Sequence, residues 1–349
     1  MMKTRVYAAA SAHAALAPST IDRRAAGDRD VSIDVLFCGV CHSDIHQARD
    51  EWGGSRFPMV PGHEIIGRVS KIGKDVTRFM AGDLVGVGCM VDSCGDCPSC
   101  VAGHEQFCQR GTAFTYNSTE MDRRTPTYGG YSQQIVVTER FVVRVPDGLD
   151  PAAAAPLLCA GVTTYSPLRQ WGCKPGVEVA VVGLGGLGHM AVKLAAAMGG
   201  HVTMLSTSAK KAEDAARLGA KDFALTSDPT TFKKLSERFD LIIDTVSAEH
   251  RYGDYLKMLR PFGAMVVVGV PPKPSVVEAF ALIHGNRRLA GSSIGGMRET
   301  QEMLDFCAQH KIVSDIETIA APAINQAYER TLRGDVRYRF VIDVSTLGS

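Results

Sequence analysis

Alternating hydrophobic and polar positions divide the chain into two regions with different patterns. Residues 31–40, 64–90 and 131–137 carry β-branched residues in short runs between glycine-containing turns, which predicts the strands of a small β-rich domain. From Pro151 the pattern changes to alanine-rich helix, followed by strands and helices in alternation. Alternation of this kind predicts βαβ units and a parallel sheet with helices on both faces.

The apolar periodicity of the second region predicts its individual elements. They are strand 177–182, helix 187–198, strand 201–205, helix 209–218, strand 241–244, helix 252–260 and strand 264–269. A helix near 299–310 and a closing strand over 338–343 follow, and we expect this tail to rejoin the first domain. The predicted fold class is therefore α/β, a doubly wound parallel sheet joined to a β-rich domain.

Length and composition narrow the class of protein. A chain of 349 residues has room for about two domains. With 45% hydrophobic residues, 21% charged residues and a formal charge of +1, nothing indicates a nucleic-acid or membrane partner. The alanine-rich start, interrupted by Ser11 and His13, predicts a first strand and turn rather than a signal peptide. The cysteine spacings indicate metal binding in a reducing compartment, so we expect a cytoplasmic protein.

Thiol and imidazole side chains mark a candidate catalytic metal site. Cys41 and His63 lie in glycine-containing turns of the first domain, and a catalytic zinc uses three protein ligands while a fourth position stays open. Cys159, in an apolar run before the glycine-rich region, is the best candidate for the third ligand, and Glu64 is a neighbouring group or an alternate ligand. Each residue alone would be interpreted as a buried thiol or a satisfied core histidine. Together they predict a zinc site.

Four cysteines in one loop form a second candidate metal site. Cys94, Cys97, Cys100 and Cys108 are spaced C-x₂-C-x₂-C-x₇-C, so their thiolates can surround one tetrahedral zinc. An iron–sulfur cluster is the alternative, because bacterial ferredoxins also use C-x₂-C-x₂-C, but their fourth cysteine follows sooner or precedes a proline. We expect a structural zinc, because four protein ligands leave no open position.

A glycine-rich turn follows the first strand of the second region. Its six residues are Gly183, Leu184, Gly185, Gly186, Leu187 and Gly188. The pattern G-x-G-x-x-G is common in loops, but its place between a predicted strand and a predicted helix indicates dinucleotide binding. The glycines allow a tight turn and bring backbone N–H groups close to a pyrophosphate.

An open zinc site and a nicotinamide site in one chain imply hydride transfer at a carbon whose oxygen the metal polarises. Such a reaction also needs a proton path. Ser43, close to Cys41, can hydrogen-bond the reacting oxygen, and His46 can pass the proton to solvent. Asp44 can orient a metal-bound histidine. Without a zinc site, Ser43 and Asp44 would be turn caps and His46 a surface imidazole.

Together these motifs resemble the zinc-dependent medium-chain alcohol dehydrogenases, and within them the cinnamyl-alcohol-dehydrogenase branch with its bacterial NADPH-dependent aldehyde reductases. The segments that carry the resemblance are Cys41–Asp44, Pro61–Glu64, the four-cysteine loop, Pro156–Tyr165 and Gly183–His189. The resemblance covers nearly the whole chain, from Val31 to the C-terminal strand. It implies a GroES-like catalytic domain over 1–159 and 298–349, with a Rossmann coenzyme domain over 160–297 between the two parts.

By matching positions, the resemblance assigns roles to further residues. It implies catalytic zinc on Cys41, His63 and Cys159, with Glu64 able to approach the metal, and Thr163 beside the nicotinamide. Positions that would line the cofactor are Thr245, Gly269, Ser293 and Ile294. Positions that would line the substrate cleft are Trp52, Cys89 and Phe114, although a Trp or Phe is more often part of a core. Family members form homodimers, or tetramers of two dimers, and we expect one of these assemblies.

Cofactor preference is predicted by the segment after the second strand of the coenzyme domain. NAD enzymes place an Asp or Glu there, about twenty residues beyond the fingerprint, to bind the ribose 2′-hydroxyl. This chain instead has hydroxyl and ammonium groups, on Ser206, Thr207, Ser208, Lys210 and Lys211. They offer donors and positive charge to a 2′-phosphate, which predicts NADP(H). A serine helix cap with solvated lysines is the alternative interpretation, and both can hold.

The sequence therefore predicts a zinc-dependent, NADP(H)-dependent oxidoreductase acting on a primary alcohol/aldehyde pair. We expect it to reduce a broad range of aliphatic and aromatic aldehydes. A non-catalytic zinc or dinucleotide-binding sensor would keep the same folds, but it would not need Ser43 and His46. A polyol dehydrogenase is a further alternative, although those enzymes often use a glutamate where Cys159 stands.

Overall fold

The computed structural model describes residues 2–348, which form two compact units. One unit extends to Cys159 and resumes at Gly295, close to the expected return at 298, and the other comprises Ala160–Ile294. Between residues 2 and 348, every helix is too short or too polar to cross a membrane.

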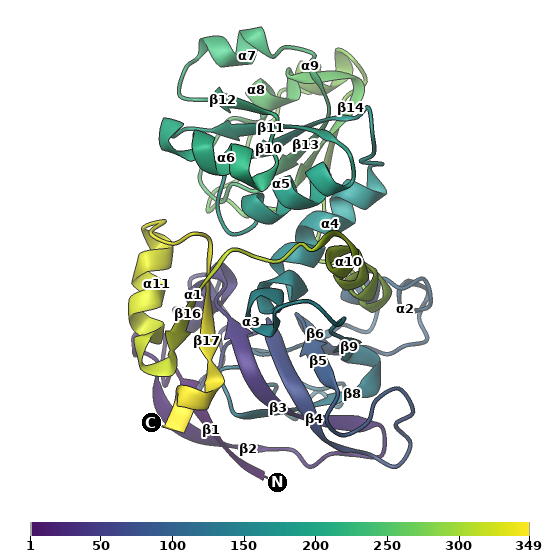
Figure 1. Ribbon diagram of the computed structural model, residues 1–349, viewed down its shortest axis with the longest axis vertical. Coiled ribbons are helices and arrows are strands. Elements are labelled where there is room, and N and C mark those ends of the chain that lie inside the picture. Colours follow the sequence, from purple (N-terminus) through teal and green to yellow (C-terminus); the bar gives the residue numbers. More distant parts are fainter. Residues whose placement is uncertain (1, 349) are drawn as a thin grey trace. The chain divides into compact units, whose positions relative to one another are not determined.

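A seven-stranded sheet forms the centre of the first unit (Figure 1). Its order is β16-β17-β3-β4-β5-β9, and β8 also pairs with β3. The strands are β3 (Asp30–Gly39), β4 (Ile65–Ile72), β5 (Leu84–Val87), β8 (Gln134–Thr138), β9 (Val143–Arg144), β16 (Ile316–Ala320) and β17 (Arg339–Asp343). Two antiparallel pairs accompany the sheet: β1 (Met2–Ala8) with β2 (Ala17–Arg23), and β6 (Met90–Asp92) with β7 (Ala113–Phe114).

The C-terminal segment belongs to this sheet. β17 pairs antiparallel with β3, so that Ile342 lies opposite Cys38, and Figure 1 shows the yellow β17 beside the purple β3. The helices of the unit are α1 (His42–Ala48), α2 (Pro98–Val101), α3 (Pro151–Ala154), α10 (Met297–His310) and α11 (Ile324–Leu332). Its 3₁₀ turns are η1 (Glu105–Phe107), η2 (Glu139–Phe141), η3 (Ala155–Leu158), η5 (Ala321–Ala323) and η6 (Val344–Gly348).

The second unit is a six-stranded parallel sheet in the order β12-β11-β10-β13-β14-β15. The strands are β10 (Glu178–Val182), β11 (His201–Ser206), β12 (Asp222–Leu225), β13 (Phe239–Asp244), β14 (Leu259–Val267) and β15 (Arg288–Gly291). The helices are α4 (Ala160–Gln170), α5 (Gly188–Ala197), η4 (Ala209–Lys211), α6 (Ala212–Leu218), α7 (Thr230–Lys234), α8 (Tyr252–Leu256) and α9 (Ala279–Ile283).

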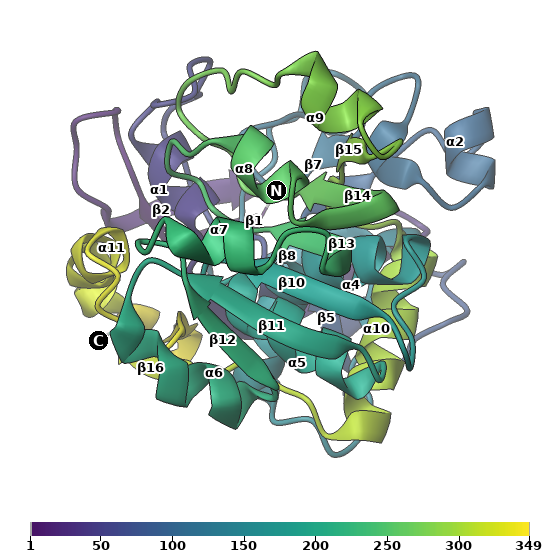
Figure 2. The same cartoon turned by 90° about the horizontal axis from the view of Figure 1, so that it is seen from above.

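Helices cover both faces of this parallel sheet. In Figure 2, α5 and α6 lie on one face, and α8 and α9 lie on the other. Val179, Val181 and Ile242 of the central strands are fully buried, because a strand covered on both sides needs an apolar residue at every position. The predicted doubly wound α/β fold class is confirmed.

Some predicted boundaries are wrong. Helix 252–260 ends at Leu256, and the next strand begins at Leu259 rather than at 264, because Leu259 is buried and already paired with β13. The predicted strand 131–137 begins at Gln134. Several elements escaped prediction, because tertiary contacts rather than a strong local period form them. They include β12, α7, α9 and β15 of the second unit and β16 and α11 of the first.

Candidate active site and metal centres

The predicted catalytic residues converge because β3 and β4 are neighbours in the sheet. Cys41 follows the end of β3, His63 and Glu64 precede the start of β4, and the two strands pair antiparallel. The chain leaving η3 supplies Cys159. One ligand atom from each of these four side chains lies within 4.8 Å of the others, and all four residues are buried. The structure therefore brings together residues from three separate segments.

The donor atoms of this cluster suit a metal ion. His63 Nε2 lies 3.2 Å from Cys159 Sγ, which lies 4.0 Å from Cys41 Sγ. The hydrogen bond with Cys159 lowers the pKa of the Cys41 thiol well below its usual value, and the positive charges of Arg339 and His63 act in the same direction. Two sulfurs and one imidazole nitrogen are a donor set of a catalytic zinc site. The residues present fit that ion.

Glu64 lies behind the cluster in a tight enclosure. One carboxylate oxygen, Oε1, accepts a hydrogen bond from Arg339 of β17, and Oε2 has no hydrogen-bond partner among the described residues. Burial raises the pKa of Glu64 to about 8, although the Arg339 charge opposes the shift. A Cβ atom at Gly39 would overlap Oε2, so only glycine leaves room for this carboxylate.

Asp44 holds the two ligand-bearing turns in place. Its side chain accepts hydrogen bonds from the backbone N–H of Cys41 at 2.8 Å and of Gly62 at 3.0 Å, and Oδ1 lies 3.2 Å from His63 Nδ1. The first contact belongs to the capping box of helix α1, and the third places a carboxylate oxygen of Asp44 within hydrogen-bond distance of the His63 imidazole.

The predicted relay residues lie on α1 beside the cluster. Ser43 Oγ is 3.8 Å from Cys41 Sγ. His46 is half-buried; its Nδ1 lies 2.5 Å from Glu51 Oε2, and its ring stacks on Trp52 at a centroid distance of 4.9 Å. Trp52 is 51% exposed and so is not a core residue. His46 thus has a fixed ring orientation and access to solvent.

The other two predicted cleft residues lie on different strands or turns. Cys89 is half-buried, with Sγ 4.0 Å from the carbonyl oxygen of Leu158, next to Cys159. Phe114 lies in β7 and is 45% exposed. Phe114 is therefore not a core residue, and Cys89 is only partly buried.

Two site residues escaped sequence reasoning. Glu51 lies five positions after His46, and its signal would have been an acid just beyond a short helix that carries a candidate relay histidine. Arg339 lies 275 positions from Glu64, and no local pattern could pair them.

The four loop cysteines also converge, with Sγ atoms within 4.8 Å of one another. Cys97 Sγ lies 3.4 Å from Cys100 Sγ, and the backbone N–H of Gln109 donates to Cys97 Sγ at 3.4 Å. Backbone hydrogen bonds from Cys100 and Gln109 lower the pKa of the Cys97 thiol to about 6. Four sulfurs around one point fit a closed tetrahedral zinc site.

The glycine-rich turn lies where the strand order of the second unit reverses. The chain runs outward from β10 to β12 and returns to β13 beside β10, which is where doubly wound sheets bind dinucleotides. Gly183 has φ +88°, and Thr245 Oγ1 donates to the carbonyl oxygens of Val182 at 2.8 Å and Gly183 at 3.1 Å. A Cβ at Gly188 would overlap the Gly183 carbonyl, whereas the space at Gly185 is open. The turn is fixed and leaves room for a ligand.

The remaining predicted cofactor residues follow strand ends of the same sheet or lie in α4. Gly269 follows β14, and Ser293 and Ile294 follow β15. Ser206 ends β11, and residues 207–211 follow it. Thr163, in α4, has a buried hydroxyl without a hydrogen-bond partner among the described residues. Ser206 is buried, and its Oγ accepts a hydrogen bond from the Ser208 N–H at 3.2 Å. Ser208 precedes the turn η4, but its side chain makes no capping hydrogen bond there, so the expected serine cap is not formed.

Comparison with known proteins identifies the family. Residues 27–147 match the family model for the alcohol dehydrogenase GroES-like domain, and residues 186–309 match that for zinc-binding dehydrogenases. The chain is 57% identical over 345 residues, 99% of each chain, to the probable formaldehyde dehydrogenase AdhA of Bacillus subtilis. The chain belongs to the zinc-dependent medium-chain alcohol dehydrogenases.

Further relatives place this dehydrogenase within the family. It is 56% identical over 350 residues, 100% of each chain, to the NADP-dependent alcohol dehydrogenase C 1 of Mycolicibacterium smegmatis. The structure of the cinnamyl alcohol dehydrogenase of Helicobacter pylori complexed with NADP(H) matches with a TM-score of 0.92 and 43% identity, over 99% of each chain. The predicted resemblance and the GroES-like plus Rossmann fold class are confirmed.

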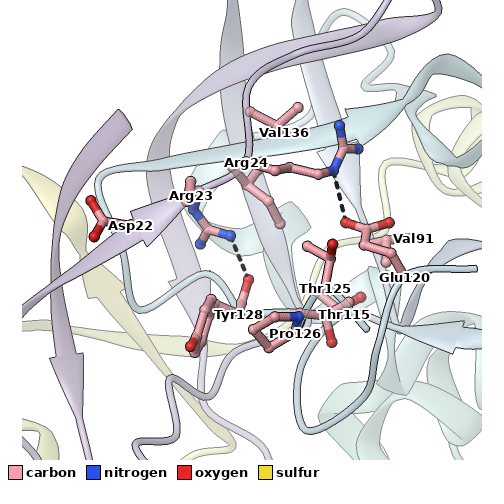
Figure 3. A pocket seen from close by; sticks show the side chains of 12 residues that line it. Asp22, Arg23, Arg24, Val91, Thr115, Glu120, Thr125, Pro126, Tyr128 and Val136 are labelled. Carbon is pink, nitrogen blue, oxygen red and sulfur yellow. Dashed lines mark hydrogen bonds and ion pairs between the residues drawn. The ribbon is translucent and has the colours of Figure 1, made fainter. Parts of the chain in front are cut away.

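A small cavity in the first unit of the dehydrogenase is distinct from the metal clusters (Figure 3). Its volume is about 40 Å³, enough for water but far below the roughly 300 Å³ of a usual ligand pocket. Arg23 donates to the carbonyl oxygen of Tyr128 at 2.9 Å and Arg24 to Glu120 at 2.9 Å, as the dashed lines show. Arg24 is paired with Glu120 and Asp30, and Arg23 donates to backbone carbonyl oxygens, so these side chains support the fold rather than a substrate.

Replacing Cys100 by alanine should remove the loop metal. The loop would lose one of four ligands, and because metal binding contributes to folding of the loop, we expect the melting temperature to fall by about 5 °C or more. Elemental analysis should show one metal ion fewer per chain. Cys173→Ala is the matched control, because this thiol lies in the second unit and outside both clusters. Unchanged metal content and melting temperature in the Cys100 variant would contradict the site.

Proposed function

We propose that this protein transfers hydride between NADP(H) and a primary alcohol/aldehyde pair, and that it reduces a broad range of aliphatic and aromatic aldehydes. The observation that carries the proposal is the buried cluster of two thiols and one imidazole beside Ser43 and His46. The relatives named as NADP-dependent alcohol dehydrogenase and formaldehyde dehydrogenase support this chemistry. A panel of aldehydes assayed by loss of NADPH absorbance separates a reductase from a non-catalytic sensor.

In this proposal Cys41, His63 and Cys159 hold the catalytic zinc, and Glu64 can approach it through Oε2. When bound, the ion polarises the substrate oxygen and the nicotinamide supplies the hydride. Asp44 keeps the His63 imidazole oriented by accepting a hydrogen bond from Nδ1. The lone pair of Nε2 is then available to bind the metal.

Proton transfer is assigned to side chains of α1. Ser43 lies beside Cys41 and can hydrogen-bond the reacting oxygen. His46 has its Nδ1 held by Glu51, so Nε2 is the nitrogen that can exchange a proton with solvent. Trp52 stacks on this ring and, with Cys89 and Phe114, would line the path of the substrate.

The coenzyme would occupy the second unit at the reversal point of the sheet. The residues assigned to it are Thr163, Gly183, Leu184, Gly185, Gly186, Leu187, Gly188, Ser206, Thr207, Ser208, Lys210, Lys211, Thr245, Gly269, Ser293 and Ile294. Hydroxyl and ammonium groups after β11, without a carboxylate, favour a 2′-phosphate over a 2′-hydroxyl. The relative solved with NADP(H) supports this preference.

Cys94, Cys97, Cys100 and Cys108 would hold a structural zinc with no part in hydride transfer, because four protein sulfurs leave no position for a substrate. Free thiols at all ten cysteines agree with a reducing compartment, and we assign the protein to the cytoplasm.

We also propose that the protein forms homodimers through the edge of the second sheet. β15 is an edge strand, and the segment before it exposes Val276, Phe280 and Ile283 at 87%, 78% and 66%. Native proteins usually cover such edges and such large apolar groups. A second copy meeting β15 would cover both, and two dimers could form a tetramer.

Replacing Cys41 by serine should reduce turnover by about 10³-fold, because Lewis-acid stabilisation contributes several kcal/mol to the transition state. We expect an unchanged circular dichroism spectrum and the loss of one zinc ion per chain. Cys173→Ser is the matched control and should keep full activity. A Cys41 variant with full zinc and normal NADPH oxidation would disprove the ligand assignment.

Replacing Ser206 by aspartate should weaken NADPH binding by at least tenfold, about 1.4 kcal/mol, because the carboxylate repels a 2′-phosphate. NADH binding should change little. Ser236→Asp places the same charge before β13, away from the strand ends that face the coenzyme, and should leave both affinities unchanged. A wild type with higher kcat/KM for NADH than for NADPH would refute the preference directly.

Replacing Ile283 by aspartate should shift the protein from dimer to monomer, because burying an unpaired charge in an interface costs several kcal/mol. Size-exclusion chromatography with light scattering measures the mass. Met80→Asp is the matched control, since Met80 is 68% exposed in the first unit. A wild type that is monomeric at micromolar concentration would rule out this assembly.

A further inference from the structure

A buried chain of hydrogen bonds joins the C-terminal return segment to His63. Tyr328, on α11, donates from its hydroxyl to the Tyr131 hydroxyl at 3.4 Å. Tyr131 in turn donates to Asp44 Oδ2 at 3.3 Å, and Asp44 Oδ1 lies 3.2 Å from His63 Nδ1. Asp44 and Tyr131 are fully buried, and Tyr328 is 3% exposed. Solvent therefore does not compete for these contacts.

The backbone of Tyr131 is attached to the same turn as its side chain. Its N–H donates to the carbonyl oxygen of Pro61 at 3.0 Å, and the Gly130 N–H donates to that of Gly62 at 2.8 Å. A Cβ at Gly62 would lie 2.7 Å from the Tyr131 ring, so the ring lies directly against the turn that carries His63. Movement of Tyr131 and movement of this turn are coupled.

The Asp44 carboxylate is held on both of its oxygens. Oδ1 faces the Gly62 N–H and His63, and Oδ2 faces the Cys41 N–H and Tyr131. Burial raises the pKa of the Tyr131 hydroxyl well above its usual value, so this group remains a hydrogen-bond donor. The tyrosine contact opposes rotation of the carboxylate, and a carboxylate that cannot rotate fixes the imidazole bonded to it.

We propose that Tyr131 and Tyr328 are positioning residues of the catalytic zinc site, which lock Asp44 and through it the imidazole of His63. The proposal rests on the proposed function, in which His63 is a zinc ligand. Tyr328 acts through Tyr131, because it contacts the Tyr131 hydroxyl and that hydroxyl contacts Asp44. Mutation of the groups that hydrogen-bond a metal-bound histidine typically lowers metal affinity by about 10–100-fold, so we expect a large effect on the rate of metal release.

The test measures the rate of zinc release from the purified holoenzyme to a chromophoric chelator. Tyr131→Phe should release the catalytic zinc about 10-fold faster than wild type, and Tyr328→Phe about 3-fold faster. The double variant should match Tyr131→Phe alone, since the hydrogen bond of Tyr328 reaches Asp44 through the Tyr131 hydroxyl. Zinc release from the cysteine loop is the phase that the Cys100→Ala variant lacks. This phase should keep its wild-type rate in the tyrosine variants, which would show that their fold is intact.

Tyr7→Phe is the matched control and should behave as wild type. Tyr7 is a buried tyrosine of the same unit, and its hydroxyl takes no part in the hydrogen bonds that link Tyr328, Tyr131 and Asp44. A wild-type release rate in Tyr131→Phe would overturn the positioning role while leaving the proposed function intact. Independent effects of the two substitutions in the double variant would overturn the route through Tyr131. A wild type that binds zinc only in the cysteine loop would overturn the proposed function together with this inference.

Discussion

The catalytic unit depends on one buried carboxylate, that of Asp44. A carboxylate removed from water costs several kcal/mol unless donors surround it, and here four donors do so. Two are backbone N–H groups of the turns at Cys41 and Gly62, one is an imidazole, and one is the phenol of Tyr131. The need to satisfy this group therefore imposes the relative positions of the turns that carry the ligands.

Close packing around the catalytic cluster restricts which residues can stand next to Glu64. Gly39 leaves the space that the Glu64 carboxylate occupies, and Arg339 neutralises one side of that carboxylate. Arg339 comes from β17 and Tyr328 from α11, both in the segment that returns after the coenzyme unit. The chain must come back to the first unit because the sheet and the outer layer of the site are incomplete without that segment.

The two metal centres use similar donors for different purposes. The loop offers four sulfurs, which satisfy a tetrahedral ion and exclude a substrate. The other cluster offers two sulfurs and a nitrogen, with Glu64 hydrogen-bonded by Arg339 and the proposed relay residue Ser43 beside Cys41. Ligand count and the neighbouring side chains, rather than the metal, separate a structural role from a catalytic one.

The sequence by itself determined the features that depend on local spacing. The cysteine loop and the glycine turn are close in the chain, so spacing alone predicts what they can bind, and alternating strands and helices predict a doubly wound sheet. The tertiary structure alone decided contacts between distant segments. The pairing of Glu64 with Arg339 and of Tyr131 with Tyr328 follows from strand order and helix docking, which bring together side chains that no local period relates.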